Sequence, residues 1–205
     1  MKLEEPKGWV CCGSTAAHSS SHLQAAALPM KTLAIVRASG RGAVTTPCPS
    51  CYSRLKASIQ EVEANGDLAQ AVSRETGYAW DGKVAVENLV DTVVDRVGLE
   101  RVSAAVKKPL AGLKVVCYYG CLMTRPPALT GAENPEYPMK MDRLAKVLGA
   151  TVLDWSYKTD CCGASLALTD TSVQLELSAR ILQNAKEVGA DAVVAACPLC
   201  HVNLD

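Results

Sequence analysis

The sequence predicts an α/β fold that consists of two pseudo-repeated domains with mostly parallel sheets and flanking helices. Two observations support this: short β-rich segments alternate with longer segments of helical period, and a set of cysteine motifs occurs twice. A Cys-Cys-Gly motif stands at 11–13 and at 161–163, and a Cys-Pro-x-Cys motif stands at 48–51 and at 197–200. Between the second Cys of each Cys-Cys pair and the first Cys of the Cys-Pro-x-Cys motif lie 35 residues in the first copy and 34 in the second. An internal repeat therefore organises the chain.

The first copy is expected to contain a helix, a strand and a second helix. Ser20 or Ser21 can cap a helix that runs to Gly40, and Pro29 is expected to kink it. A short β-rich segment at 44–46 leads into the Cys-Pro-Ser-Cys motif. Apolar residues spaced by three and four then predict a second helix; they are Leu55, Ile59 and Val62.

The second copy shows the same alternation over a longer segment. Cys121 follows the end of an apolar run that reads as a buried strand, and Gly189 is expected to stop the last long helix. The predicted strands are 113–119, 151–155 and 191–196, and the predicted helices are 138–148 and 173–188.

The domain boundaries follow from the repeat. We assign 1–83 to the first domain, 84–110 to a connecting helix and linker, and 111–205 to the second domain. The second copy has a strand, a cysteine, a helix and a strand before its Cys-Cys-Gly motif, whereas the first copy has ten residues there. We therefore expect the full protein to carry a further cysteine upstream of Cys11 and a helix after Cys200.

Composition excludes several classes of protein. The 21 basic and 21 acidic residues cancel, so no global positive field favours nucleic acid. The first residues contain no apolar signal-like segment, and no apolar run approaches the ~18 residues needed to cross a bilayer. We expect a cytoplasmic protein with neither a membrane span nor a nucleic-acid partner.

Ten cysteines in 205 residues indicate metal ligation or redox chemistry. In a reducing compartment these roles are commoner than structural disulfides, and adjacent cysteines do not easily close on each other. Thiolates are soft donors that select zinc, copper(I) or iron–sulfur clusters. Because ligands gather at the carboxyl ends of parallel strands, we expect Cys121, the pair at 161–162 and Cys197 to converge. Gly13 and Gly163 are predicted to form tight turns beside the site.

The order and spacing of these motifs resemble a known family, the cysteine-rich CCG domain of the heterodisulfide reductase B subunit and its relatives. In the second copy the resemblance lies in Tyr119-Gly120-Cys121, Cys161-Cys162-Gly163 and Cys197-Pro198-Leu199-Cys200. In the first copy it lies in Trp9-Val10-Cys11-Cys12-Gly13 and Cys48-Pro49-Ser50-Cys51-Tyr52.

The resemblance implies a non-cubane [4Fe-4S] cluster in each complete domain, held by five cysteines. It implies that the two clusters split a disulfide, such as that of coenzyme M and coenzyme B. Because binding of the sulfur to iron needs no acid or base, we name no catalytic side chain. It also implies partner subunits that carry further iron–sulfur clusters and a flavin. The implied ligands are Cys121, Cys161, Cys162, Cys197 and Cys200 in the second copy, and Cys11, Cys12, Cys48 and Cys51 in the first.

Other functions stay open at the level of sequence. They are an electron-transfer or scaffold component of another oxidoreductase complex, a structural zinc protein, and a dithiol oxidoreductase that uses one Cys-x-x-Cys pair. His201 completes the pattern of c-type haem attachment, but Tyr52 stands there in the first copy. Cys117 is expected to be a small buried hydrophobe. Arg125 either binds an anionic group of a substrate or belongs to an ordinary surface loop.

Overall fold

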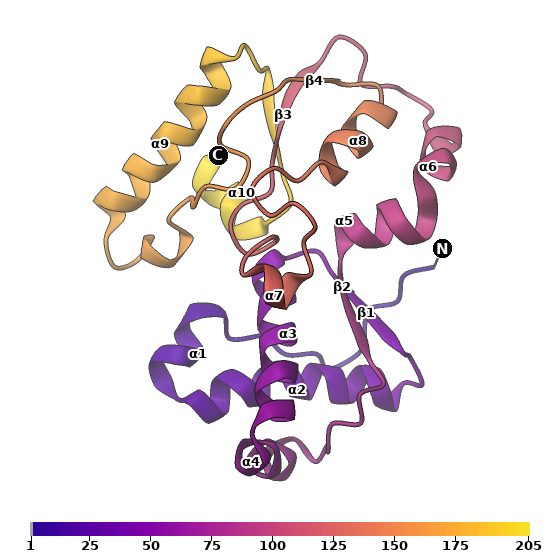
Figure 1. Cartoon of the computed structure of the whole chain (residues 1–205), viewed down its shortest axis with the longest axis vertical. Helices are drawn as coiled ribbons and strands as arrows, with labels where there is room; N and C mark the ends of the chain where they lie inside the picture. Colours follow the sequence, from indigo (N-terminus) through magenta and orange to yellow (C-terminus); the bar gives the residue numbers. More distant parts are fainter. Residues whose placement is uncertain (1) are drawn as a thin grey trace. The chain divides into compact units, whose positions relative to one another are not determined.

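The computed structural model describes residues 2–205, which form two compact units. The first unit ends at Asn88, and the second runs from Leu89 to Asp205 (Figure 1). Helices and parallel strands alternate in both units, which confirms the predicted α/β class. The predicted domain limits at 83 and 110 stay a prediction.

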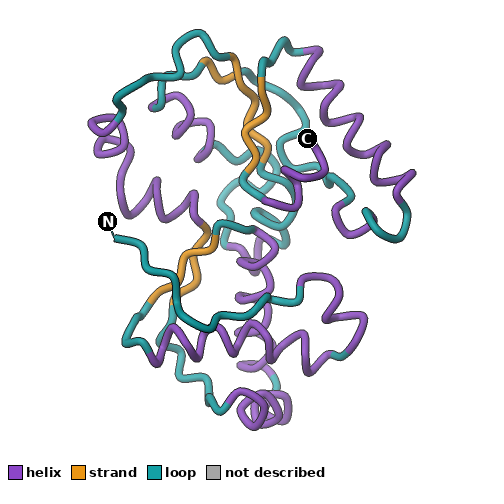
Figure 2. The backbone as a smooth tube through the Cα atoms, turned by 180° about the vertical axis from the view of Figure 1, so that it is seen from behind, coloured by secondary structure: helices purple, strands orange, loops and turns teal. Residues whose placement is uncertain are grey.

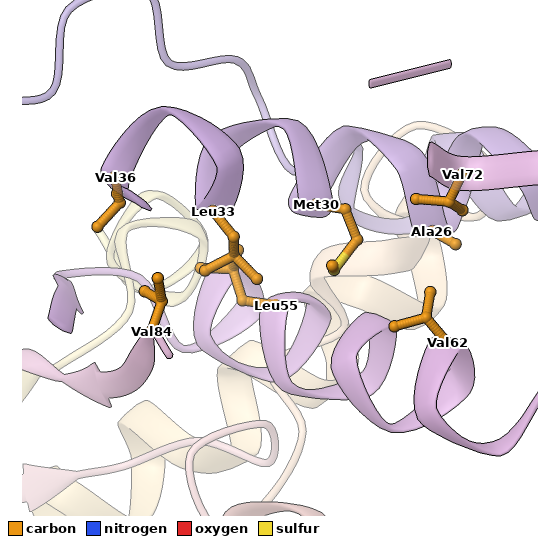
Figure 3. Packing of buried hydrophobic residues seen from close by; sticks show 8 residues of the cluster. All are labelled: Ala26, Met30, Leu33, Val36, Leu55, Val62, Val72 and Val84. Carbon is orange, nitrogen blue, oxygen red and sulfur yellow. The ribbon is translucent and has the colours of Figure 1, made fainter. Parts of the chain in front are cut away.

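The first unit contains a two-stranded parallel sheet packed against helices. Strand β1 (Ala43–Thr46) pairs with β2 (Ala85–Asn88), with Ala43 opposite Ala85. The helices are α1 (Ser14–Ser20), α2 (His22–Ala38), α3 (Pro49–Ala64) and α4 (Gly66–Thr76). Side chains from α2, α3 and α4 pack together with Val84 in one hydrophobic core (Figure 3); its buried members are Ala26, Met30, Leu33, Val36, Leu55, Val62, Val72 and Val84.

Pro29 lies inside α2 and changes its hydrogen bonding. Because proline has no N–H, the carbonyl of Ala25, one turn earlier, loses its usual partner within the helix. That carbonyl instead accepts hydrogen bonds from Ser58 Oγ at 3.4 Å and Arg54 Nη2 at 3.3 Å, both on α3. The proline thus creates a polar contact between two helices. Of the two predicted caps, Ser21 is the one observed.

The second unit contains a three-stranded parallel sheet in the order β4-β3-β5. Helices α8 and α9 lie on opposite sides of its strands, which Figure 2 shows in orange. The strands are β3 (Lys114–Tyr118), β4 (Thr151–Val152) and β5 (Ala192–Ala195). The helices are α5 (Leu89–Asp91), the π-helix η1 (Thr92–Gly98), α6 (Leu99–Ala105), α7 (Pro127–Thr130), α8 (Lys140–Val147), the 3-10 helix η2 (Ala164–Leu166), α9 (Thr171–Glu187) and α10 (Pro198–Leu204).

Two predicted elements are wrong in extent. The helix expected from residue 84 begins only at Leu89, because the preceding residues form β2 and bond to β1. Pairing with a distant strand outweighs the local helical pattern. The strand expected at 151–155 ends at Val152. The chain then leaves the sheet, and the Trp155 indole donates a hydrogen bond to the carbonyl of Cys117 at 3.1 Å.

A buried ion pair lies beside the sheet of the second unit. Lys158 Nζ lies 2.5 Å from Asp142 Oδ1, and both side chains are almost fully buried, 1% and 3% exposed. Tyr119 Oη donates to the other oxygen of Asp142 at 2.7 Å and accepts from the backbone N–H of Met141 at 2.7 Å. This network joins the residue that follows β3, helix α8 and the loop before the second Cys-Cys-Gly motif.

Replacing Asp142 by Ala is expected to lower the free energy of unfolding by about 3–5 kcal/mol, because the buried Lys158 charge then loses its carboxylate partner. Urea denaturation followed by circular dichroism measures the loss. The double variant Asp142→Leu with Lys158→Met removes both charges and should recover most of the stability. A single variant as stable as the wild type would contradict this account of the ion pair.

Candidate metal centres

Nine of the ten cysteines belong to two sets, one in each unit. The first cysteine set consists of Cys11, Cys12, Cys48 and Cys51, and the second consists of Cys121, Cys161, Cys162, Cys197 and Cys200. These are the residues that the sequence predicts as ligands. That they bind metal stays a prediction.

The glycines of the two Cys-Cys-Gly motifs both have a left-handed backbone conformation. Gly13 has φ +78° and precedes α1, and Gly163 has φ +76° and precedes η2. Such left-handed angles favour glycine. A Cβ atom at Gly163 would lie 2.9 Å from the Cα of Gln174 on α9, so the turn also needs the absence of a side chain. The predicted tight turns are confirmed.

The Cys-Pro-x-Cys motifs are equivalent as well. Cys48 caps α3 with φ −117° and ψ 116°, and Cys197 caps α10 with φ −108° and ψ 125°. Each motif directly follows a strand, β1 or β5, and a proline occupies the first position of each helix. The cysteines therefore lie at the carboxyl ends of parallel strands, as the sequence predicts.

In the first cysteine set, residues far apart in the chain meet at their sulfur atoms. Cys51 Sγ lies 3.2 Å from Cys12 Sγ. This hydrogen bond lowers the pKa of the buried Cys12 thiol to about 6. The hydrogen bonds that Cys51 makes with Cys12 and Cys48 raise the pKa of Cys51. Cys11 is exposed.

The second cysteine set has an equivalent contact, between Cys162 and Cys200, and an additional one between Cys161 and Cys121. Cys162 Sγ lies 3.4 Å from Cys200 Sγ, and this hydrogen bond lowers the pKa of Cys162 to about 6. A hydrogen bond with Cys121 likewise lowers the pKa of Cys161 to about 6. The pKa of Cys200 is raised by its bonds to Cys162 and Cys197. All five cysteines of this set are thus connected through hydrogen bonds and the adjacent pair.

The sulfur contacts favour thiolates at three of the cysteines. In each contact one thiol retains its proton, while the cysteine of the Cys-Cys-Gly motif loses its own more readily. The thiolate is the form that binds metal. Among residues 2–205, no three His, Cys, Asp or Glu side chains are already grouped around a position for a single metal ion.

Hydrogen bonds to consecutive residues, Lys158 and Thr159, hold the loop before the second Cys-Cys-Gly motif in place. The carbonyl of Lys158 accepts from the N–H groups of Tyr119 and Gly120 at 2.8 and 3.2 Å. Arg125 donates to the carbonyl and the hydroxyl of Thr159, both at 3.1 Å. These bonds hold the loop against the end of β3, where Cys121 follows.

Two further residues hold Cys162, and the sequence did not single them out. Ser178 Oγ on α9 and Asn203 Nδ2 on α10 donate to the Cys162 carbonyl at 3.2 and 3.0 Å. Asn203 Nδ2 also lies 3.7 Å from Cys162 Sγ. Asn203 stands three residues after Cys200, and Arg54 stands three residues after Cys51. A polar residue one helical turn beyond the Cys-Pro-x-Cys motif in both copies is the sequence feature from which Asn203 could have been found.

The remaining candidates behave differently. Cys117 is fully buried in β3, and burial raises its pKa to about 12, as befits the small buried residue that was predicted. Arg125, considered as an anion-binding residue, pairs with Glu136 as well as with Thr159.

In the part of the chain that the structure describes, no helix combines the length and apolar character that a bilayer crossing requires.

Comparison with known proteins identifies related sequences. The family model of the CCG cysteine-rich domain matches residues 1–56 and 115–205. The chain is 29% identical over 206 residues to the 8-methylmenaquinol:fumarate reductase membrane anchor subunit of Wolinella succinogenes, a match that covers 100% of this chain and 72% of that protein. It is 27% identical over 184 residues to the B subunit of the ferredoxin/F(420)H(2)-dependent CoB-CoM heterodisulfide reductase of Methanosarcina acetivorans, a match that covers 87% and 61%.

A third relative, from Archaeoglobus profundus, is named as a protein like the B subunit of heterodisulfide reductase. It is 26% identical over 213 residues, which cover 100% of this chain and 71% of that protein. The resemblance predicted from the cysteine motifs is confirmed. These relatives are, by name, subunits of reductases or similar to one, and the chain spans 61–72% of their lengths.

Two glycine variants separate the effect of the left-handed turn from that of close packing. Gly163→Ala and Gly189→Ala both place a side chain at positive φ, but Gly189 has open space around it. Gly189→Ala is expected to cost about 1–2 kcal/mol in free energy of unfolding. Gly163→Ala should cost more, because its Cβ meets the backbone of α9. Urea denaturation compares the two, and equal losses would contradict the packing argument.

Proposed function

Because the chain belongs to the CCG cysteine-rich domain family, we propose that its two cysteine sets hold iron–sulfur clusters and that it serves as the cluster-bearing subunit of a disulfide reductase of the CoB–CoM heterodisulfide type. The observation that carries this proposal is the second cysteine set. It draws together Cys121, a Cys-Cys pair and a Cys-x-x-Cys pair from three separate segments of the chain.

The donor set suits such a cluster. The second set offers five soft sulfur ligands, and the first offers four, the number that a [4Fe-4S] cluster commonly takes. We assign the second set, with its five cysteines, to the non-cubane type of cluster. Buried Cys12 and Cys162 would form the inner side of each centre, whereas exposed Cys11 and Cys161 would face solvent. A small disulfide could approach each centre from that side.

Disulfide cleavage fits the chemistry of such centres. When bound, an iron–sulfur cluster passes electrons one at a time and offers iron to a thiolate sulfur, and reduction of a disulfide takes two electrons. The residues of this chain would hold the sulfur ligands in place and keep water from the inner side. We assign no acid or base side chain to the reaction. Electrons would come from partner subunits with iron–sulfur clusters and a flavin, in the cytoplasm.

A second candidate function is electron transfer within a quinol-linked reductase complex. It is favoured by the 29% identity, over the whole chain, to the membrane anchor subunit of a fumarate reductase. In that role the clusters would relay electrons without cleaving a disulfide. Turnover distinguishes the two: the loaded protein, given a low-potential donor and the CoB–CoM disulfide, releases thiols only in the first role.

Anaerobic reconstitution is expected to load the chain with about four iron and four acid-labile sulfide per occupied set. The EPR spectrum of the oxidised protein should change when a thiol is added, because the sulfur would reach the cluster. Iron and sulfide analysis together with EPR provide the measurement. A folded protein that retains only zinc or free thiols after reconstitution would refute the cluster proposal.

Cys162→Ala should abolish iron loading of the second set, whereas Cys117→Ala should leave it unchanged. Both residues are buried cysteines of the second unit, but only Cys162 contacts another cysteine of the set. Iron content per chain, measured on proteins of equal helical content, is the readout. Equal loss of iron in the two variants would show that core packing alone explains the effect.

A further inference from the structure

The side-chain amide of Asn203 makes two hydrogen bonds to one cysteine of the second set. Its nitrogen Nδ2 lies 3.0 Å from the carbonyl oxygen of Cys162 and 3.7 Å from the Cys162 sulfur. A primary amide carries two N–H donors, so both acceptors can be bonded at the same time. Because the carbonyl can only accept, it also settles which end of the amide faces Cys162. The second N–H is then available to the sulfur of the same residue.

The direction of this side chain follows from its place on α10. Asn203 stands three residues after Cys200, so the two side chains share one face of the helix. The Cα–Cβ bonds of a helix tilt toward its N-terminus, which in α10 is the end that carries Cys197 and Cys200. Cys162 is buried, and its sulfur lies 3.4 Å from that of Cys200. Asn203 therefore reaches a sulfur inside the second cysteine set.

The first copy of the repeat has different residues at the equivalent positions. Asn203 is the sixth residue of α10, and Arg54 is the sixth residue of α3. A second side chain that donates to the Cys162 carbonyl is Ser178. Ser178 is the eighth residue of α9, and Pro29 is the eighth residue of α2. Both helix positions that hold Cys162 thus differ between the copies.

The two pairs of residues serve different carbonyls. In the first copy, the proline in α2 frees the carbonyl of Ala25, and Arg54 donates to it at 3.3 Å. In the second copy, both side chains donate to the carbonyl of Cys162, and Asn203 also reaches its sulfur. The two positions change together, and in the second copy they converge on a cysteine.

We propose that Asn203 is a positioning residue of the second cysteine set, and that its hydrogen bond to the Cys162 sulfur raises the reduction potential of a cluster held there. The inference rests on the proposed function, because it needs a cluster at these cysteines. Reduction makes a cluster and its sulfur ligands more negative. A donor to a ligand sulfur stabilises that state, which is why such bonds tune the potential.

The test compares Asn203→Leu with Ser178→Ala in the full reconstituted chain. Each variant removes one hydrogen bond to the Cys162 carbonyl, but Asn203→Leu also removes the bond to the sulfur. Iron content and the midpoint potential from an EPR-monitored redox titration are measured for both. We expect both variants to retain their iron. The midpoint of the second centre should fall further in Asn203→Leu than in Ser178→Ala, which reports the loss of a carbonyl bond alone.

The outcomes separate the two proposals. A wild-type chain that binds no cluster overturns the proposed function and this inference with it. Loaded variants with equal midpoints, or a midpoint that rises in Asn203→Leu, overturn this inference alone and leave the proposed function standing.

If Asn203→Leu does not retain iron, a spectroscopic measurement on the wild type decides. Asparagine with an isotope-labelled nitrogen in its side-chain amide is incorporated, and the reduced protein is measured by pulsed EPR. A coupling between the labelled nitrogen and the cluster is expected, because the hydrogen bond connects the amide of Asn203 to a ligand sulfur. A loaded wild type without this coupling would overturn the inference.

Discussion

The second cysteine set depends on how the segment from Lys158 to Cys162 is tied to the rest of its unit. Four of its backbone carbonyls accept hydrogen bonds from the turn after β3, from Arg125, from Tyr118 at the end of β3, and from the helices α9 and α10. The buried pair of Lys158 and Asp142 fixes the start of the segment. A loop without regular structure can hold two adjacent cysteines in place because its polar groups are satisfied by rigid elements.

The two copies of the repeat agree in backbone conformation at the motifs but differ in the charge of a residue close to them. Equivalent glycines and helix-capping cysteines have nearly the same dihedral angles in both copies. One turn beyond the Cys-Pro-x-Cys motif, however, the first copy has the cation Arg54 and the second the neutral amide Asn203. Arg54 is among the groups that lower the pKa of Cys12, whereas Asn203 holds Cys162 by hydrogen bonds. The same scaffold therefore offers two different electrostatic environments.

Burial and proton sharing act together on the cysteines. Burial alone raises the pKa of a thiol, as it does for Cys117. In the two sets the hydrogen bond with a neighbouring thiol offsets that cost, so Cys12 and Cys162 have a lowered pKa although both are buried. Convergence of the motifs, more than any single residue, therefore lowers the pKa of these buried cysteines.

The sequence by itself determined the α/β class, the repeat, the strands that lead into the two Cys-Pro-x-Cys motifs, and the cysteines that make up the two sets, because these depend on local periodicity and on motif spacing. Only the tertiary structure decided that 85–88 is a strand and that Tyr118 bonds to the segment of the Cys-Cys pair while Tyr119 bonds to Asp142. It also decided the roles of Ser58, Ser178 and Asn203. Such roles arise from hydrogen bonds between residues distant in the chain, and no local pattern in the sequence encodes them.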